Sequence, residues 1–186
     1  MGIALADTAA DYGAEVTLVL GPVERIPKNT SVKIINVVSA QEMASECKAA
    51  FPGCDIAILS AAVADFTPAE ISNRKIKREG EDILLKLKPT GDIAAALGQM
   101  KGKSQLLVGF ALETHNEMAN ASAKLKRKNL DLIVMNSLQD EGAGFGKDTN
   151  KVTLIDSNNI IDKFELKSKE EAARDILDKI VALLKS

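Results

Sequence analysis

The sequence predicts an α/β protein with a Rossmann-like, mostly parallel sheet, helices on both faces, a projecting β flap and a C-terminal β-hairpin. The prediction rests on three observations. Short apolar runs typical of buried strands alternate with segments of helical periodicity. The helical segments are about a dozen residues long, which favours parallel pairing through right-handed crossovers. A chain of 186 residues is long enough for one domain with a sizeable core, so we treat residues 1–186 as a single domain.

The first third of the chain shows this alternation clearly. Apolar residues at helical spacing predict an N-terminal helix that ends at Gly13, before a β-rich run at residues 15–20. The pattern continues with a strand, a helix and a strand over residues 32–38, 40–51 and 55–60. A helix followed by a parallel strand forms the second half of a β-α-β unit. No strand is predicted before the N-terminal helix. We therefore expect that Met1 is not a natural start and that the chain is truncated inside or just after a phosphate-binding turn.

The stretch at residues 61–78 follows the strand predicted at 55–60 and reads A-A-V-A-D-F-T-P-A-E-I-S-N-R-K-I-K-R. Side chains just past the end of a buried parallel strand lie where open α/β sheets bind their ligands. Small residues there let a substrate approach the backbone. Asp65 suits a metal or a hydroxyl group, and Lys75 and Lys77 suit phosphates.

The end of this stretch has two interpretations. Residues 75–78 and 83–87, joined by Glu79-Gly80-Glu81-Asp82, are compatible with a hairpin that projects from the sheet. The alternative is a solvated basic ribbon, and the pattern alone does not separate the two.

The next third of the chain returns to helices and strands. Thr90-Gly91-Asp92 predicts a turn into a helix through Met100, with Thr90 or Asp92 as its N-cap. A strand, a helix and a strand follow over residues 105–110, 113–128 and 130–135. Lys124 and Lys128 stand four residues apart on the helix, so they share a face that suits a polyanion, although basic residues at a helix C-terminus also serve capping and solubility.

The C-terminal part predicts a hairpin and a last helix. Residues 152–155 and 160–166 flank an Asn-rich turn, and Ser168 with Glu171 forms a capping box before an amphipathic helix. The Gly-rich segment at 141–147 does not have the G-x-G-x-x-G spacing, and no helical pattern follows it. We therefore reject a dinucleotide-binding fingerprint there.

Composition excludes several classes of function. With 24 basic and 26 acidic side chains the net charge is -2, which argues against a nucleic-acid-binding surface. No apolar run approaches the ~20 residues that span a bilayer, so we expect a cytoplasmic protein without a membrane segment. Cys47 and Cys54 are too sparse for a disulfide framework or a zinc site. Because His115 is the only histidine, a Ser-His-Asp triad or a multi-histidine metal centre would depend on that residue.

Charged residues do gather at the predicted strand ends and helix termini. Lysines beside carboxylates suit a nucleoside triphosphate with a divalent ion, where catalysis consists mainly of positioning and charge neutralisation. The residues concerned are Asp65, Lys75, Lys77, Asp92, Lys124 and Lys128.

Six motifs in consistent order resemble the phosphopantothenate–cysteine ligase family, often the C-terminal half of a bifunctional bacterial protein of coenzyme A biosynthesis. They stand at residues 13–23, 61–68, 75–77, 108–114, 124–136 and 144–152, and they read G-A-E-V-T-L-V-L-G-P-V, A-A-V-A-D-F-T-P, K-I-K, V-G-F-A-L-E-T, K-x-K-R-K-N-L-D-L-I-V-M-N and G-F-G-K-D-T-N-K-V. The resemblance covers nearly the whole chain.

The resemblance implies a dimeric enzyme that uses CTP and Mg²⁺ to join 4'-phosphopantothenate to cysteine through an acyl-cytidylate. It implies a basic flap exchanged between subunits and fusion to a flavin-dependent phosphopantothenoylcysteine decarboxylase. By position it assigns Lys75 to charge stabilisation on the transferring phosphoryl group and Ala61 and Ala62 to the pantothenoyl arm. The implied nucleotide-binding residues are Asp65, Lys75, Gly91, Asp92, Ile93, Ala94, Phe110, Lys124 and Lys128. It names no metal ligand.

Two departures from the family's pattern affect these expectations. Gly91 stands where the family usually has proline, which loosens the turn but keeps its backbone donors. The family's Asn-containing and Ser-Ser-Gly-Lys segment would lie upstream of Met1, so we expect this chain alone to catalyse poorly.

Three alternatives stay open. The first concerns the nucleotide, which is CTP or ATP, because selection of the base depends on backbone donors and on the shape of the pocket. A non-catalytic dimerisation or nucleotide-binding module and a nicotinamide or flavin oxidoreductase are the other classes of function, although fold does not supply function.

Overall fold

The computed structural model describes residues 1–70, 72, 74, 75, 77, 80, 83–113, 117–137 and 148–185. Its helices are α1 (Gly2–Asp11), α2 (Ala40–Ala50), η1 (Phe51–Gly53), α3 (Ile93–Met100), α4 (Glu117–Arg127) and α5 (Lys169–Leu184). Its strands are β1 (Thr17–Leu20), β2 (Lys33–Asn36), β3 (Ile56–Leu59), β4 (Phe66–Pro68), β5 (Leu87–Pro89), β6 (Leu106–Glu113), β7 (Leu132–Ser137), β8 (Thr149–Asn150), β9 (Val152–Asp156), β10 (Ile161–Lys163) and β11 (Lys167–Ser168).

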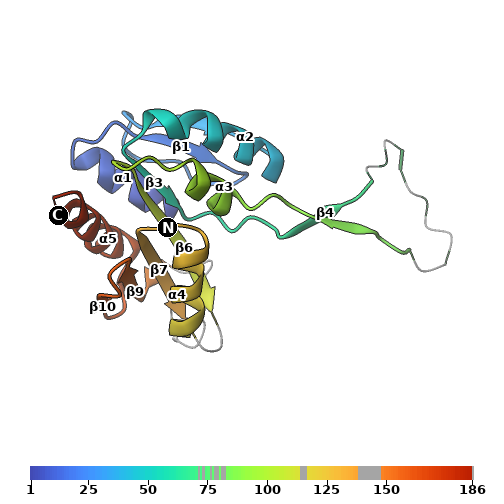
Figure 1. The fold of residues 1–186 in the computed structure, drawn as a ribbon. Coiled ribbons are helices and arrows are strands. Elements are labelled where there is room, and N and C mark those ends of the chain that lie inside the picture. Colours follow the sequence, from blue (N-terminus) through green and yellow to red (C-terminus); the bar gives the residue numbers. More distant parts are fainter. Residues whose placement is uncertain are drawn as a thin grey trace.

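The central sheet has five strands in the order β10-β9-β7-β6-β3 (Figure 1). Strands β3, β6 and β7 are parallel, whereas β9 and β10 form the predicted C-terminal hairpin and join the sheet antiparallel to β7. Strands β1 and β2 pair in parallel as a separate two-stranded sheet. The prediction of a parallel-containing α/β sheet is confirmed, and the hairpin adds its antiparallel edge.

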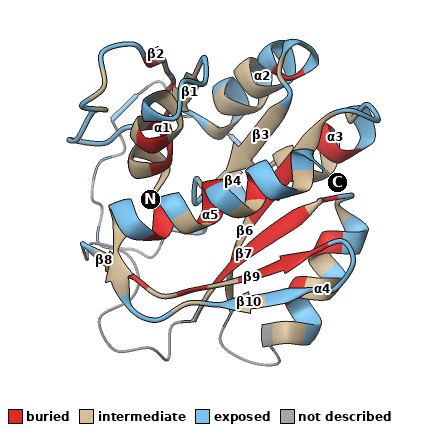
Figure 2. Cartoon of the chain, turned by 90° about the vertical axis from the view of Figure 1, so that its left-hand side faces the viewer, coloured by how far each residue is buried: buried red, intermediate tan, exposed pale blue. Residues whose placement is uncertain are grey.

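Helices cover both faces of this sheet, as predicted. Alternate residues of a strand point to opposite faces, and the core accordingly divides into two clusters. Val108, Leu132 and Val134 pack with Leu5 of α1 and Ile176 of α5 on one face. Figure 2 shows α5 lying across the buried strands β6, β7 and β9. On the other face the sheet packs against helical residues that include Phe51, Leu97, Ala121 and Leu125.

Local sequence signals explain most helix boundaries. Gly13 has φ +87° just after α1, a conformation that glycine adopts without steric cost. Ser168 and Glu171 form the predicted capping box of α5. Helix α4 begins at Glu117 rather than at the predicted residue 113. The reason is that β6 continues to Glu113, which lies opposite Ser137 of β7.

The predicted β flap is present, and its described strands are β4 and β5. Part of the hairpin predicted at residues 75–87, namely residues 76, 78, 79, 81 and 82, lies outside the described residues. Phe66–Pro68 pairs antiparallel with Leu87–Pro89, and the described residues between them form no strand. We call the described residues within 66–89 the arm, and Figure 1 shows its strand β4 projecting from the body of the molecule. Of the alternating residues Ile83, Leu85 and Leu87, only Leu87 lies in a strand, and the three side chains are 64%, 63% and 51% exposed.

Other expectations concern thiols and membranes. Cys47 and Cys54 are free thiols, as predicted, and burial raises the pKa of each. Within the described ranges, no helix is long and apolar enough to cross a membrane.

Candidate functional site

A cleft of about 930 Å³ opens at the carboxyl ends of β3 and β6, where ligands bind in open α/β sheets. Four segments form its mouth: the loop after β3, the turn before α3, the strand β6 and the last turns of α4. The residues that these segments contribute include Ala61, Val63, Asp65, Thr90, Gly91, Asp92, Ile93, Ala94, Phe110, Lys124 and Lys128.

Thr90 fastens the turn before α3 to the loop after β3. Its backbone N–H donates to the Asp65 carbonyl oxygen at 2.9 Å, and its hydroxyl donates to the Ala64 carbonyl oxygen at 2.5 Å. The same residues begin the arm, since β4 follows Asp65 directly and β5 ends directly before Thr90. These two hydrogen bonds therefore hold the Asp65 backbone beside the N-terminus of α3.

Asp92 joins α3 to α4. Its Oδ1 accepts a hydrogen bond from the Ala95 N–H at 3.0 Å, so Asp92 is the N-cap, and its Oδ2 lies 3.1 Å from Lys128 Nζ. Partial burial favours the neutral carboxyl, but the Ala95 hydrogen bond and the Lys128 ammonium outweigh it and lower the pKa of Asp92. The carboxylate therefore stays charged at neutral pH and orients Lys128 at the mouth of the cleft.

The close approach of α3 and α4 positions Lys124 and Lys128. A Cβ atom on Gly98 would lie 2.0 Å from the Lys128 carbonyl oxygen, so only glycine lets α3 come this near to the C-terminus of α4. Asn129 completes the contact, because its side-chain amide donates to the Gly98 carbonyl oxygen at 2.8 Å. Its backbone has φ 52°, the left-handed conformation common just after a helix. Lys124 and Lys128 consequently lie on the α4 face that borders the cleft.

The structure brings together most of the residues that the sequence singled out. Ala61, Asp65, Gly91, Asp92, Ile93, Ala94, Phe110, Lys124 and Lys128 all line the one cleft. Ala62 and Lys75 do not line it, and both are exposed. Lys75 lies in the arm, beyond the β4–β5 pairing. His115 and the Gly-rich segment at 141–147 fall outside the described residues.

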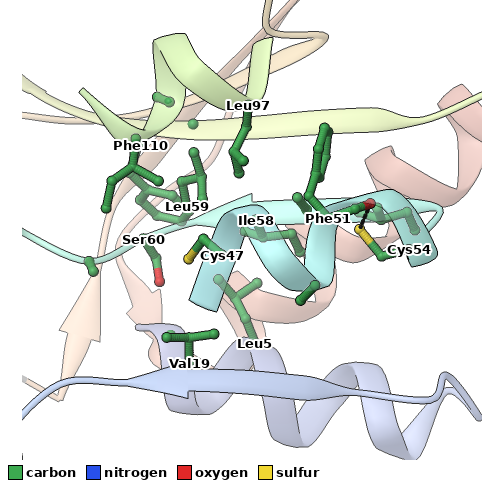
Figure 3. Close-up of a pocket in the computed structure, with 18 of the residues that line it drawn as sticks. Leu5, Val19, Cys47, Phe51, Cys54, Ile58, Leu59, Ser60, Leu97 and Phe110 are labelled. Atoms are coloured by element: carbon green, nitrogen blue, oxygen red, sulfur yellow. Dashed lines mark hydrogen bonds between the residues drawn. The ribbon is translucent and has the colours of Figure 1, made fainter. Parts of the chain in front are cut away.

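Apart from Phe110, which the family resemblance assigned to nucleotide binding, the apolar floor of the cleft was not predicted from the sequence. Leu59, Leu97 and Phe110 line it next to Ser60, and Cys47 reaches it from α2 (Figure 3). The sequence pattern predicted Leu59 as part of a strand and Leu97 as part of a helix, and it did not indicate that either residue lines a cleft. No local signal distinguishes a side chain that lines a cleft from one that fills a core. Thr90 was considered only as a cap, and its hydrogen bonds to the loop after β3 depend on residues 25 and 26 positions away.

The mouth of the cleft has the donors and charges for a phosphorylated ligand. Lys124 and Lys128 supply positive charge, and the first turn of α3 presents backbone N–H groups with a favourable dipole for anions. No group of three or more His, Cys, Asp or Glu side chains in the described part of the chain is arranged to hold a metal ion. Mg²⁺ often binds through one or two carboxylates together with substrate phosphates, and Asp65 lines the cleft and fits that role, whereas both oxygens of Asp92 are engaged by the Ala95 N–H and Lys128.

Sequence comparison relates the chain to pantothenate metabolism. The sequence model described as "DNA/pantothenate metabolism flavoprotein C-terminal domain" matches residues 1–184. The chain is 62% identical over 184 residues to a "Cysteine/Cysteine sulfinic acid decarboxylase" of an unknown prokaryotic organism, covering 99% of the chain and 51% of that relative. It is 42% identical over 185 residues to "Coenzyme A biosynthesis bifunctional protein CoaBC" of Bacillus subtilis (strain 168), covering 100% of the chain and 45% of that relative. The chain thus spans about half the length of these curated relatives.

Structure comparison points the same way. The fold resembles the crystal structure of the C-terminal domain of coenzyme A biosynthesis bifunctional protein CoaBC, with a TM-score of 0.83 and 35% sequence identity. The match covers 99% of this chain and 82% of that one. The architecture described above is therefore that of a known domain at nearly full coverage.

Proposed function

The chain belongs to the DNA/pantothenate metabolism flavoprotein C-terminal domain family, and from this membership we propose that it is a CTP-dependent phosphopantothenate–cysteine ligase domain of coenzyme A biosynthesis. One observation carries the proposal beyond the family: Asp65, Asp92, Lys124 and Lys128 converge on one cleft with the N-terminus of α3. The 42% identity to a coenzyme A biosynthesis protein supports the same assignment.

The proposed reaction has two balanced steps. A carboxylate oxygen of 4'-phosphopantothenate attacks the α-phosphorus of CTP, and the bond to the β-phosphate oxygen breaks, which releases pyrophosphate and leaves an acyl-cytidylate. The cysteine amine then attacks the acyl carbon. The acyl–oxygen bond breaks, CMP leaves with the electron pair, and the nitrogen loses a proton to give the amide.

Each residue of the cleft has a role in this proposal. Lys124 and Lys128 hold phosphate oxygens, the backbone N–H groups of Ile93 and Ala94 face the base, and Asp65 accepts from a ribose hydroxyl or binds the metal. Phe110 packs beside the nucleotide, and the backbone at Ala61 and Ala62 contacts the pantothenoyl arm. Bound Mg²⁺ would neutralise charge on the triphosphate. The ion pair between Lys128 and Asp92, 3.1 Å long, keeps one of these cations in place before the ligand arrives.

Lys75 requires a second subunit in this proposal. It is exposed on the arm and does not line the cleft of its own chain. The arm leaves Ile83, Leu84 and Leu85 64%, 99% and 63% exposed, so it carries apolar surface that a partner would cover. We therefore assign the Lys75 role to the arm of the other subunit in a homodimer.

A mixed-dimer experiment tests the site and the dimer together. Lys75→Gln changes only the arm, and Lys128→Gln changes only the cleft. If the arm acts on the other subunit, each variant alone loses most activity, about 10²-fold or more for a lost charge contact in the transition state. A dimer with one chain of each kind regains one intact site. The measurement is CTP-dependent pyrophosphate release with 4'-phosphopantothenate, followed by CMP release when cysteine is added.

The assay uses the chain joined to the segment that directly precedes the matched region in the Bacillus subtilis relative. Lys88→Gln is the matched control, because Lys88 lies in the arm strand β5 and does not line the cleft. Activity of Lys75→Gln equal to that of the control would contradict the assignment and favour a dimerisation module. ATP replacing CTP at equal efficiency would contradict the choice of nucleotide.

The chain works, in this proposal, as half of a longer protein. The CoaBC relatives of Bacillus subtilis and Haemophilus influenzae are named as bifunctional, and the chain covers 45% and 44% of them. We assign the other half to the flavin-dependent decarboxylase that acts on the ligase product. The decarboxylase name of the 62% identical relative refers to a protein of which the chain covers 51%.

A further inference from the structure

The carboxyl end of α3 carries a lysine whose charge is turned inward. Lys101 directly follows the last residue of α3, and its side chain is only 11% exposed. Its Nζ donates to the two carboxylate oxygens of Asp131 at 2.8 and 2.9 Å and to the Asn129 carbonyl oxygen at 2.8 Å. An ammonium group has three N–H donors, and these three acceptors use them all. Solubility therefore does not explain this lysine.

Asp131 ties this lysine to the central sheet. Its Oδ2 accepts a hydrogen bond from the Leu107 N–H at 2.7 Å, and its own N–H donates to the Leu107 carbonyl oxygen at 2.9 Å. Leu107 belongs to β6 and is fully buried. Three residues further along β6 stands Phe110, which lines the candidate site. Lys101 is therefore anchored to the strand that forms one wall of the cleft.

Asn129 forms the turn that ends α4. The Leu130 N–H donates to the Leu125 carbonyl oxygen, and the Asn129 N–H donates to the Lys126 carbonyl oxygen. Together these bonds make a Schellman motif, in which the residue after the helix takes the left-handed conformation. Asn129 takes it with φ 52°. Glycine does so without steric cost, whereas asparagine pays part of that cost. Two hydrogen bonds to the end of α3, one from its side chain and one to its carbonyl oxygen, offset it.

Lys128 directly precedes this turn, so the turn determines where the Lys128 side chain starts. Its Nζ lies 3.1 Å from Asp92 Oδ2, at the amino end of α3. Helix α3 has 8 residues, about 12 Å at 1.5 Å per residue, and is thus tied to the end of α4 at both of its own ends. The Asp92 side chain is 48% exposed, whereas that of Lys101 is 11% exposed. Because solvent and salt screen an exposed pair more than a buried one, the contact made by Lys101 is the firmer of the two.

We propose that Lys101 is a positioning residue of the candidate site, which fixes Asn129 and thereby holds Lys128 at the mouth of the cleft. This assignment rests on the proposed function, in which Lys128 holds phosphate oxygens of the nucleotide. Lys101 does not line the cleft, and Asp131 neutralises its charge, so its effect on the ligand is geometric rather than electrostatic. It sets the separation between Lys128 on one side of the nucleotide and Phe110 of β6 on the other.

Calorimetric titration of Lys101→Met with CTP and with inorganic pyrophosphate tests this role, in the protein used for the ligase assay. Methionine keeps the apolar part of the side chain but has no N–H donor. We expect Kd to rise about tenfold for both ligands, because misplacing a binding group by about 1 Å can cost up to about 10²-fold. The number of binding sites should stay the same. A variant that only unfolds more easily would instead bind at fewer sites with the parental Kd.

Three further variants separate positioning from charge and from surface effects. Lys101→Arg keeps the charge and a planar fork that fits a carboxylate, so Kd should stay within about threefold of the parental value. Lys103→Met removes an exposed lysine two residues further on and should leave Kd unchanged.

The third variant combines Lys101→Met with Asp131→Asn. It leaves no carboxylate without its cation, so it should be more stable than Lys101→Met alone. The Asn129 carbonyl oxygen still lacks its donor, so Kd should remain raised. A parental Kd in this double variant would assign the effect to the unpaired Asp131 carboxylate and overturn the positioning role.

Amide exchange reports on the turn without any ligand. The amides of Lys128, Asn129 and Leu130 close the last turn of α4 and should exchange roughly tenfold faster in Lys101→Met, because local opening controls their exchange. The amide of Leu125, which is buried within α4, is the internal control.

Unchanged exchange at the three amides, or a parental Kd in Lys101→Met, would overturn the proposal. A parent protein that binds neither CTP nor pyrophosphate would overturn the proposed function itself. Faster exchange would then show that Lys101 is a structural contact only, and its positioning role would be wrong together with that function.

Discussion

At the scale of single residues, Asp92 has the clearest double role. It caps α3 through the Ala95 N–H and holds Lys128 at 3.1 Å. Asn at this position keeps a capping oxygen but loses the charge, whereas Ala loses both. We expect Asp92→Ala to lower the free energy of unfolding by about 1 kcal/mol and Asp92→Asn by less, because exposed ion pairs contribute about 0–1 kcal/mol. Urea unfolding at pH 7 measures both changes.

The pH dependence of these variants follows from the lowered pKa of Asp92. A carboxyl whose pKa is lower in the folded state stabilises the fold above its unfolded pKa of about 4 and loses that contribution as pH falls through the folded pKa. The stability difference between the parent chain and Asp92→Asn should therefore be present at pH 7 and shrink below pH ~4. A difference that grows on acidification would contradict the ion-pair interpretation.

At the scale of elements, the contact between α3 and α4 positions the lysines of the cleft. A Cβ atom on Gly98 would meet the Lys128 carbonyl oxygen at 2.0 Å, so Gly98→Ala must push the helices apart. We expect a loss of about 1–3 kcal/mol of unfolding free energy, typical of overpacking, although alanine is otherwise the better helix former. Nucleotide binding should weaken as well, because Lys128 moves with α4.

The matched control for this substitution is Gly53→Ala. A Cβ atom on Gly53 has no neighbour within 4 Å, and its φ lies outside the left-handed region. Denaturant unfolding and a CTP titration of both variants check the prediction. Equal stability of Gly98→Ala and Gly53→Ala would show that the two helices do not need their close approach.

At the scale of the whole molecule, the arm is an appendage rather than part of the core. The Ala69 N–H donates to the Lys86 carbonyl oxygen at 2.9 Å, so an Asn-Gly turn can replace residues 70–85 and close the hairpin. Because Ile83, Leu84 and Leu85 are exposed, we expect Tm to shift by less than about 3 °C, which corresponds to roughly 1 kcal/mol for a chain of this size. Calorimetry measures the shift.

Ile176→Ala is the contrasting variant. Ile176 is fully buried between α5 and the sheet, so its truncation should cost about 2–5 kcal/mol. A shortened arm that unfolds the body as much as Ile176→Ala does would contradict the division between arm and core. If the arm forms the contact of the proposed dimer, the protein with the shortened arm should also sediment as a monomer.

The sequence by itself determined the helices and the strands of the central sheet in their order, but not the short strands β4, β8 and β11. Helical spacing of apolar residues, the Ser168–Glu171 capping box and the Asp92 cap act over a few neighbouring residues, so they were readable locally. The alternation of helices and strands was enough to predict a parallel-containing sheet with helices on both faces. The family resemblance assigned most of the site residues, and nine of the assigned residues line one cleft: Ala61, Asp65, Gly91, Asp92, Ile93, Ala94, Phe110, Lys124 and Lys128.

Only the tertiary structure decided which segments meet. The arm pairs at Phe66–Pro68 and Leu87–Pro89, a pairing between segments about 20 residues apart that local alternation does not report. The division between β1 and β3, the approach of Gly98 to Lys128 and the exposed position of Lys75 depend on contacts between residues distant in sequence. Periodicity reports how a segment folds on itself, whereas a cleft depends on the packing of several segments whose relative positions no single segment encodes.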